Sequence, residues 1–212
     1  MKELFLLSGL GADKRVFDYL DLGRHNIHHV NWIAPVPNES LKEYARRLLP
    51  QITAHRPILI GVSFGGMIAL EIANITSVEK VILISSAKSA SAIPSYYRVI
   101  SAFRLDRLIS PASLKKPNEV FYWLFGVTTK EHKSLLKSIM QDTDEKFLNW
   151  AMAAIPSWMS GPTPENVIQI HGTSDRILKG PAADYLVKDG GHLMVVTKAE
   201  KVNEILHKIL DE

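Results

Sequence analysis

Short apolar runs recur along this chain and are separated by longer segments in which apolar residues repeat at helical spacing. The runs are rich in Val, Ile and Leu, which is typical of strands that are covered on both faces. They predict strands at residues 4–7, 27–33, 58–60, 81–84, 167–170 and 183–187. Helical segments follow the first three strands, and this alternation predicts a parallel sheet with right-handed crossovers.

Helix start signals support this alternation. Asp13 is expected to cap a short helix after the first strand. Ser40 and Glu43 form a capping box before an amphipathic segment that extends to Ile52. The same pattern predicts further capping boxes at Thr128/Glu131, Asp142/Glu145 and Thr197/Glu200.

The alternation is interrupted between residues 88 and 160. No strand is predicted there, whereas helices are predicted at residues 97–108 and 119–125 and after two of the capping boxes. Three of the four tryptophans also fall in this stretch. We therefore expect a single domain over residues 1–212, with a core of residues 1–87 and 161–212 and a helical cap of residues 88–160.

The segment around Ser63 organises the rest of the chain. An apolar run leads into Gly61-Val62-Ser63-Phe64-Gly65, and a second run rich in helix formers follows at once. A strand that turns directly into a helix strains the corner residue and requires small neighbours, which Gly61 and Gly65 provide. The corner presents the Ser63 hydroxyl at a helix N-terminus, where negative charge is favoured. This context favours a nucleophile elbow over an incidental serine in a glycine-rich turn.

Composition narrows the class of protein. Of the 212 residues, 46% are hydrophobic and 22% are charged, as in an ordinary globular domain. The net charge of +3 is small, so nucleic-acid binding is not expected. The absence of cysteine excludes disulfides and thiolate metal sites. The apolar N-terminus is too short for a signal peptide or a membrane span, and we expect a cytoplasmic protein that does not bind membranes.

Other binding motifs in the sequence are weak. Gly9 and Gly11 begin a dinucleotide-binding pattern, but Lys14 stands where its third glycine is required. His28 and His29 are adjacent on a predicted strand and would point to opposite faces, which argues against a metal pair. We therefore predict neither a metal nor an organic cofactor.

Ser63, Asp175 and His192 each follow the end of a predicted strand. In an open parallel sheet these ends lie along one edge, so residues that are far apart in the sequence can meet there. An imidazole can take the serine proton, and a carboxylate on its other nitrogen fixes the tautomer. Asp13 is the main alternative to Asp175 as the acid of the triad, although its expected role as a helix cap explains this residue without catalysis. His171 is expected to be structural.

The chain resembles the α/β-hydrolase superfamily in four segments: L-L-S-G-L-G-A-D, G-V-S-F-G-G, I-H-G-T-S-D and D-G-G-H. The resemblance implies an α/β-hydrolase fold, with an open parallel sheet of about six strands in the order 2-1-3-4-5-6, helices on both faces and a helical cap. It also implies an oxyanion hole formed by the backbone N–H groups of Leu10 and Phe64. Two departures are visible. Ser8-Gly9 stands where the family often has His-Gly, and two edge strands of the full fold are not found.

This resemblance implies a serine hydrolase that cleaves a small carboxylic ester or thioester through an acyl-enzyme. Related families use the same residues for acyl transfer, C–C cleavage and lyase chemistry. A protein that binds small ligands with little or no turnover is the alternative outside catalysis. The expected partner is a small-molecule substrate with an apolar acyl or alcohol part, and the oligomeric state stays open. The predicted pocket residues are four aromatic residues of the cap: Trp123, Phe125, Trp150 and Trp158.

Overall fold

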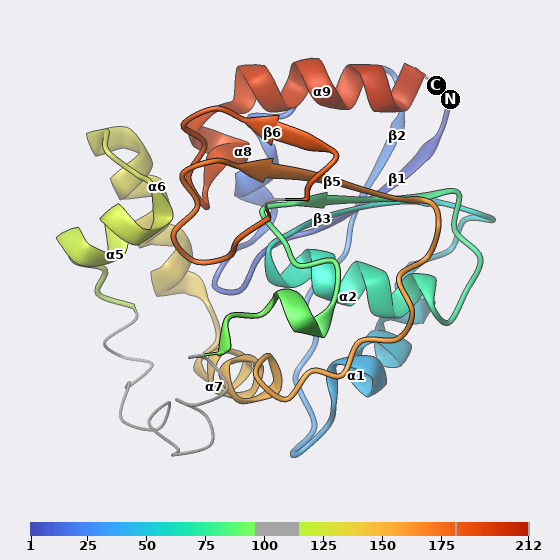
Figure 1. Ribbon diagram of the computed structural model, residues 1–212. Helices are drawn as coiled ribbons and strands as arrows, with labels where there is room; N and C mark the ends of the chain where they lie inside the picture. The colour runs from blue at the N-terminus through green and yellow to red at the C-terminus, as the bar shows by residue number, and fades with distance from the viewer. Residues whose placement is uncertain (96–114, 181, 212) are drawn as a thin grey trace.

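The structure, a computed structural model, describes residues 1–95, 115–180 and 182–211. At the centre of these residues is a six-stranded sheet in the order β2-β1-β3-β4-β5-β6 (Figure 1). Each pair of neighbouring strands is parallel. The predicted strand order is therefore confirmed. The strands are β1 (Glu3–Leu7), β2 (Asn26–His29), β3 (Ile58–Val62), β4 (Lys80–Ile84), β5 (Val167–Gly172) and β6 (Tyr185–Val187).

The two edge strands are shorter than predicted. β2 ends at His29, because the N–H of Asn31 donates to the side chain of Gln51 rather than to a neighbouring strand. β6 does not include Ala183, whose N–H closes a turn on the carbonyl of Gly180. Side-chain and turn hydrogen bonds thus take the place of ladder bonds at both edges.

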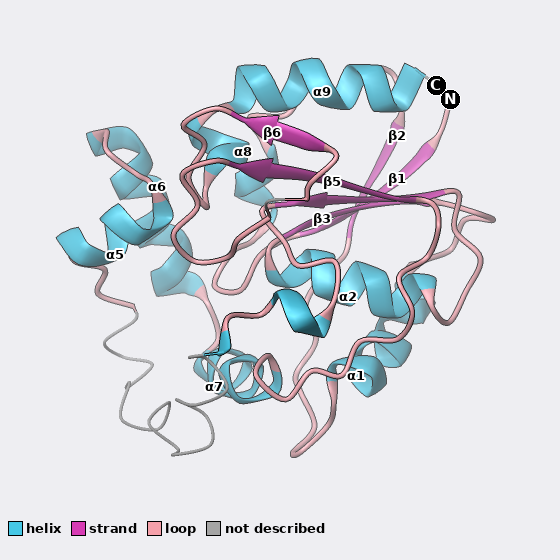
Figure 2. Cartoon of the chain, viewed as in Figure 1, coloured by secondary structure: helices cyan, strands magenta, loops and turns pink. Residues whose placement is uncertain are grey.

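Helices cover both faces of the sheet and the C-terminal ends of its strands (Figures 1 and 2). One face is covered by α1 (Leu41–Leu48) and α2 (Phe64–Ala73), and the other by α8 (Met194–Thr197) and α9 (Ala199–Asp211). The strand ends are covered by α5 (Glu119–Phe125), α6 (Lys130–Asp142) and α7 (Glu145–Ala154). The 3₁₀ helices are η1 (Lys14–Phe17), η2 (Leu49–Gln51) and η3 (Ala90–Ala92).

The side chains of alternating strand residues pack in two different hydrophobic cores. In β3, Ile58 and Ile60 pack in the core that includes α8 and α9, whereas Leu59 packs in the core that includes α1 and α2. Because successive side chains of a strand point to opposite faces, one buried strand supplies both cores. The sheet is therefore covered on both faces along its central strands, as the unbroken apolar runs predict.

His28 and His29 point to opposite faces of β2, as predicted. The ring of His28 stacks on Phe5 with centroids 4.6 Å apart, and the ring of His29 lies 5.9 Å from that of Phe17. Phe5 and Phe17 belong to different hydrophobic cores. The two imidazoles are therefore unable to share a metal ion.

Two of the predicted helix starts are confirmed. Asp13 accepts a hydrogen bond from the N–H of Arg15 at the start of η1. Ser40 and Glu43 form both hydrogen bonds of a capping box before α1. The predicted box at Thr197 is wrong. This residue ends α8, and its hydroxyl donates to a carbonyl of its own helix.

Neighbouring residues compete for the remaining caps. Thr129 caps α6 in place of Thr128, and Asp144 caps α7 in place of Asp142. Asp142 instead ends α6 and lies 2.7 Å from the guanidinium of Arg15. The two predicted capping boxes are therefore wrong: each helix has a single side-chain cap one or two residues further along, because a tertiary ion pair and the position of the helix decide between nearby polar side chains.

The predicted helix at residues 97–108 lies outside the described residues. In the described parts of the predicted cap, residues 88–95 and 115–160, the structure contains helices and no strand. The division into a core and a cap stays a prediction, because part of the segment is not described.

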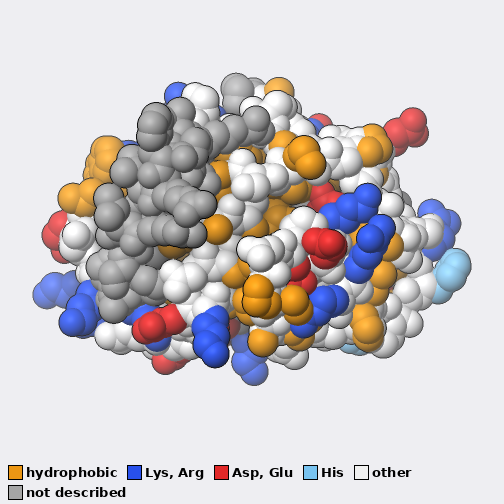
Figure 3. All heavy atoms as spheres, turned by 90° about the horizontal axis from the view of Figure 1, so that it is seen from below, with side chains coloured by type: hydrophobic (Ala, Val, Ile, Leu, Met, Phe, Trp, Pro, Cys, Tyr) orange, Lys and Arg blue, Asp and Glu red, His pale blue; other side chains and the backbone are white. Residues whose placement is uncertain are grey.

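The surface on the side of α1, α2 and α7 mixes hydrophobic, basic and acidic side chains (Figure 3). A groove of about 870 Å³ lies between α7 and the segment that leads into α1. Its hydrophobic wall includes Val36, Trp150 and the largely exposed Met159. None of the helices in the described parts of the chain is both long enough and apolar enough to cross a bilayer.

Candidate active site

The corner between β3 and α2 places Ser63 in an uncommon backbone conformation. Its φ of 52° and ψ of −118° lie outside the regions that non-glycine residues usually adopt. The Ser63 N–H donates to the carbonyl of Ile84 over 2.9 Å, and its carbonyl accepts from the hydroxyl of Ser86 over 2.6 Å. The end of β4 thus holds the strained corner in place.

The glycines beside Ser63 are required by close backbone contacts. A β-carbon on Gly61 would overlap the backbone of Gly66, and one on Gly65 would overlap the carbonyls of Leu7 and Ser8. Larger residues would push α2 away from β1 and β3. The G-x-S-x-G pattern is therefore explained by packing as well as by the turn itself.

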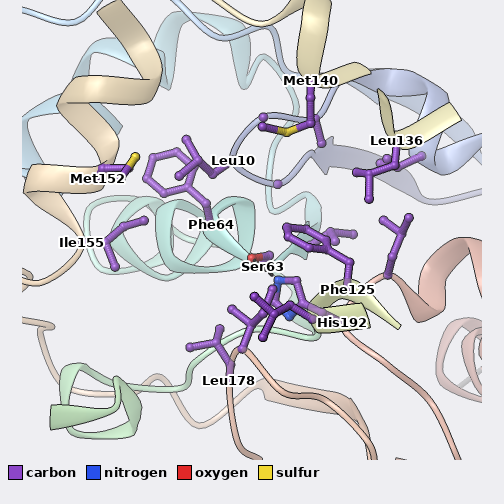
Figure 4. A pocket seen from close by; sticks show the side chains of 18 of the residues that line it. Leu10, Ser63, Phe64, Phe125, Leu136, Met140, Met152, Ile155, Leu178 and His192 are labelled. Carbon is purple, nitrogen blue, oxygen red and sulfur yellow. Dashed lines mark hydrogen bonds between the residues drawn. The ribbon is translucent and has the colours of Figure 1, made fainter. Parts of the chain in front are cut away.

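The side chains of Ser63, His192 and Asp175 form a continuous hydrogen-bonded chain. Nε2 of His192 lies 2.9 Å from Oγ of Ser63 (Figure 4), and Nδ1 lies 2.8 Å from Oδ2 of Asp175. An ionised carboxylate only accepts hydrogen bonds, so Nδ1 carries the proton and Nε2 can accept from the serine hydroxyl. The structure thus brings together the three residues that the sequence singles out.

The carboxylate of Asp175 is buried and fully hydrogen-bonded. Its Oδ1 accepts from the N–H groups of Ile177 and Leu178 at 2.8 and 3.0 Å. Burial alone would raise the pKa of Asp175, but the hydrogen bonds from His171, His192 and the Leu178 N–H outweigh it and lower the pKa below its usual value. Asp175 is therefore held as a carboxylate opposite Nδ1.

Asp13, the alternative acid, has a different role. Its carboxylate caps η1 and forms an ion pair with Arg15. Burial would raise the pKa of Asp13, but hydrogen bonds from Arg15 outweigh burial and lower it. These contacts explain Asp13 without catalysis.

The loop that carries His192 is fixed by two neighbouring segments. A β-carbon on Gly172, at the end of β5, would overlap the carbonyl of Gly190. On the other side, the N–H of Leu193 donates to the carbonyl of Phe125 over 3.0 Å. The rings of Phe125 and His192 are nearly perpendicular, with centroids 5.4 Å apart. His192 is thus held between the sheet and the end of α5.

The backbone N–H groups of Leu10 and Phe64 lie near Ser63 and have no hydrogen-bond partner among the described residues. The Phe64 N–H is the first of α2, where no carbonyl of the same helix can reach it. Leu10 belongs to the loop after β1 and lines the same cavity as Ser63. A β-carbon on the preceding Gly9 would lie 3.5 Å from Cβ of Ser63. Both residues that the resemblance implies as oxyanion donors therefore lie at the cavity.

A cavity of about 500 Å³ opens onto Ser63 and His192 (Figure 4). It is bounded by the loop after β1, by the start of α2, and by α5, α6 and α7. Aliphatic and methionine side chains form most of its wall, among them Leu10, Leu136, Met140, Leu148, Met152, Ile155 and Leu178. This volume and lining are typical of a site for a small apolar ligand.

Of the four aromatic residues predicted for the pocket, only Phe125 lines this cavity. Trp123 is 58% exposed, and the guanidinium of Arg176 stacks over its ring at 4.4 Å. Trp158 is buried elsewhere, where its Nε1 donates to the carboxylate of Glu71 over 2.7 Å. The prediction is therefore wrong for Trp123 and Trp158, whose polar or charged partners direct them away from Ser63.

Trp150 also lies outside the cavity. It faces α1, where its ring centroid is 4.3 Å from that of Tyr44. Phe64 and Phe147 join the same aromatic cluster, at centroid distances of 6.0 and 5.8 Å from Trp150. The cluster packs α7 onto α1 and α2, so this tryptophan serves packing rather than the pocket.

Most of the cavity residues that the sequence analysis missed are aliphatic residues and methionines. Leu148, Met152 and Ile155 recur at helical spacing along α7 and its end, on a different face from Trp150. This second apolar stripe is the sequence signal from which these cavity residues could have been predicted. Within the described residues, no group of three or more His, Cys, Asp or Glu side chains is arranged to hold a metal ion.

Comparison with known proteins identifies the family of this chain. The sequence model of the alpha/beta hydrolase family matches residues 4–205. A search of curated proteins gives no match. Many solved structures are similar in fold. An esterase from Exiguobacterium antarcticum is 17% identical with a TM-score of 0.74, and an enol-lactonase from Burkholderia xenovorans LB400 is 17% identical with a TM-score of 0.71. Both comparisons cover 100% of this chain and 92% of the other.

A third similar structure is the 2-hydroxy-6-oxo-6-phenylhexa-2,4-dienoate hydrolase from Rhodococcus sp. strain RHA1. It is 15% identical with a TM-score of 0.69, over 100% of this chain and 91% of the other. At these identities the structures indicate a shared fold, and the family model covers nearly the whole sequence. This chain therefore belongs to the alpha/beta hydrolase family.

Proposed function

We propose that this protein is a serine hydrolase that cleaves a small carboxylic ester or thioester through an acyl-enzyme. The observation that carries the proposal is the chain of hydrogen bonds from Ser63 through His192 to Asp175, which opens onto an apolar cavity. A serine hydroxyl becomes an effective nucleophile when a base accepts its proton, and this arrangement supplies that base.

In the first half of the reaction, Oγ of Ser63 attacks the substrate carbonyl while its proton moves to Nε2 of His192. The carbonyl oxygen takes up negative charge beside the N–H groups of Leu10 and Phe64, which have no hydrogen-bond partner among the described residues. The intermediate then collapses and the bond to the alcohol or thiol breaks. The leaving group receives the proton from His192, and the acyl group stays on Ser63.

The second half of the reaction releases the acyl group. Water replaces the alcohol or thiol and gives a proton to Nε2 of His192 as its oxygen attacks the acyl carbonyl. Collapse of the second intermediate breaks the ester bond to Ser63, whose oxygen takes the proton back. Throughout, Asp175 stabilises the imidazolium and keeps Nδ1 protonated. The products are a carboxylic acid and an unchanged enzyme.

The cavity supports a substrate with an apolar acyl or alcohol part. Its wall is built almost entirely from hydrophobic side chains, and its volume of about 500 Å³ limits the substrate to a small molecule. The names of the similar structures include an esterase, an enol-lactonase and a hydrolase, which are consistent with acyl chemistry on this fold. Acyl transfer, C–C cleavage and lyase chemistry with the same three residues are the alternatives to hydrolysis.

The experiment that tests the proposal is hydrolysis of a panel of acyl esters and thioesters of graded chain length. The purified protein should cleave some of them, and Ser63→Ala should not. Covalent labelling by a fluorophosphonate should also depend on Ser63. A protein that binds these esters without cleaving them, and that resists labelling, would be a ligand-binding member of the family.

A further inference from the structure

Asp175 contacts a second buried imidazole, that of His171, which the proposed reaction does not use. The His171 side chain is 1% exposed. Its Nε2 lies 3.1 Å from the carbonyl of Leu178 and 3.4 Å from Oδ2 of Asp175. A carbonyl and a carboxylate only accept hydrogen bonds, so Nε2 carries the proton. The N–H of His171 is therefore directed at the turn that holds the triad's acid.

The same turn holds the other oxygen of the carboxylate. The N–H groups of Ile177 and Leu178 donate to Oδ1 of Asp175. Leu178 thus receives a hydrogen bond from His171 at its carbonyl and passes one to Asp175 from its N–H. His171 is on β5, so this network fastens the 175–178 turn to the sheet. Among the described residues, the charged or titratable groups within ion-pair distance of Asp175 are His171 and His192.

The other ring nitrogen of His171, Nδ1, makes no such contact among the described residues. This atom is buried and has no hydrogen-bond partner in the part of the chain that the structure describes. The ring also packs so closely on Gly180 that a β-carbon there would overlap it. A buried polar atom without a partner is costly, and a leucine would fill much of this space without that cost. The N–H at Nε2 is therefore the feature of this side chain that the site requires.

We propose that His171 is a positioning residue that holds the carboxylate of Asp175 on Nδ1 of His192 by fixing the 175–178 turn. The inference rests on the proposed function, because it assigns His171 to the same reaction. His171 is absent from the cavity wall, so it acts on the chemistry only through Asp175. Its loss should therefore lower kcat and leave KM nearly unchanged.

Three substitutions separate this role from simple packing. His171→Gln places an amide N–H near the position of Nε2, His171→Asn places the same amide near Nδ1, and His171→Leu removes the donor. Leu and Asn should lower kcat for the best ester by roughly 10-fold, while Gln keeps it within about 3-fold of the wild type. The second-order rate of fluorophosphonate labelling should follow the same order. Crystal structures should show the Asp175–His192 hydrogen bond kept with Gln and lost or split between conformers with Asn.

The outcomes distinguish this inference from the proposed function. If the wild type cleaves esters and the Gln and Asn variants have equal kcat, His171 only fills space and the inference is wrong. The Gln–Asn comparison decides this even where the Leu variant fails to fold. If the wild type neither cleaves esters nor reacts with the probe, the proposed function fails, and the crystal structures still decide whether His171 holds Asp175 in place. An unchanged Asp175–His192 contact in the Asn variant would overturn the inference.

Discussion

Nε2 of His192 lies 2.9 Å from Oγ of Ser63, although 129 positions separate the two residues in the sequence. The corner after β3 fixes Ser63, and the loop after β6 fixes His192. Because the strands are parallel, their C-terminal ends lie along the same edge of the sheet. The contact is therefore a product of strand order, because β4 and β5 separate β3 from β6 in the sheet.

Replacing Ser63 by Ala should abolish ester hydrolysis while leaving the fold intact. The hydroxyl is the proposed nucleophile, and loss of the triad's action costs on the order of 10⁴-fold or more in kcat. Initial rates with purified variant and wild type measure the effect. Ser157→Ala is the control, because that hydroxyl is exposed and donates to the carbonyl of Ala153 in its own segment. Hydrolysis by Ser63→Ala at the wild-type rate would rule out the mechanism.

Substitutions in α6 that enlarge the cavity should shift the substrate preference towards esters with longer acyl chains. Leu136→Ala and Met140→Ala each remove side-chain atoms from the wall that faces Ser63. An apolar pocket discriminates by roughly 1–3 kcal/mol per methylene-sized change, so the shift should be graded. The ratio of kcat/KM for long and short acyl esters measures it.

Trp123→Ala is the matched control for the cavity experiment. It removes a larger side chain from the predicted cap, but Trp123 lies outside the cavity. Its chain-length preference should match that of the wild type. If Trp123→Ala changes the preference and the two α6 variants do not, the cavity is not the acyl site.

The carboxylate of Asp175 should make stability depend on pH in the acid range. Its pKa is lower in the folded protein than the usual value of about 3.9, so the ionised form stabilises the fold above that value. The stabilisation is lost as the pH falls through the lower, folded-state pKa. The difference in unfolding free energy between wild type and Asp175→Asn should therefore be constant above about pH 5 and change in favour of the variant below about pH 4. Urea unfolding between pH 3 and pH 7 measures it, and a difference that does not vary with pH would contradict the assignment.

Trp158 should contribute to stability through the buried carboxylate of Glu71. Trp158→Phe removes the N–H that donates to Glu71 over 2.7 Å and leaves a buried acceptor without this partner. Such a loss costs about 1–3 kcal/mol of unfolding free energy. Trp123→Phe is the control, because its ring is largely exposed. Adding Glu71→Leu to Trp158→Phe should recover part of the loss, and a further loss instead would show that the hydrogen bond is not the cause.

The sequence pattern was sufficient for a parallel sheet and for the three residues that meet at Ser63, whereas the strand order followed from the resemblance to the α/β-hydrolase superfamily. The first two depend on local patterns: buried runs mark strands, and polar residues just after them mark the strand ends. In a parallel sheet that information determines which residues share an edge. The contact between Asp175 and His192 follows from the same reasoning, although their distance had to come from the structure.

The lining of the cavity could not be predicted in this way. It depends on how each helix is rotated, and α7 has apolar residues on two faces. Trp150 turns towards α1, while Met152 and Ile155 turn towards Ser63. Aromatic residues were predicted because of their size, yet Trp150 packs between helices, Trp158 donates to Glu71 and Trp123 is largely exposed. For the same reason, Asp142 was predicted to cap α7, whereas the cap is Asp144. The ion pair of Asp142 is a tertiary contact that a local sequence pattern does not contain.

The N–H of Phe64 has no hydrogen-bond partner within the part of the chain that the structure describes, and the ring of Phe64 belongs to the aromatic cluster that packs α7. Its ring centroid lies 5.7 Å from that of Phe147 on α7. Under the proposed mechanism, Phe64 therefore has two roles. Its N–H stabilises the oxyanion, and its ring packs against α7, which forms part of the cavity wall. A bulky substrate that forced α7 outward would strain the turn on which its own hydrolysis depends. Under that mechanism, the upper size limit for substrates would depend on the stiffness of this aromatic cluster and not on empty volume alone.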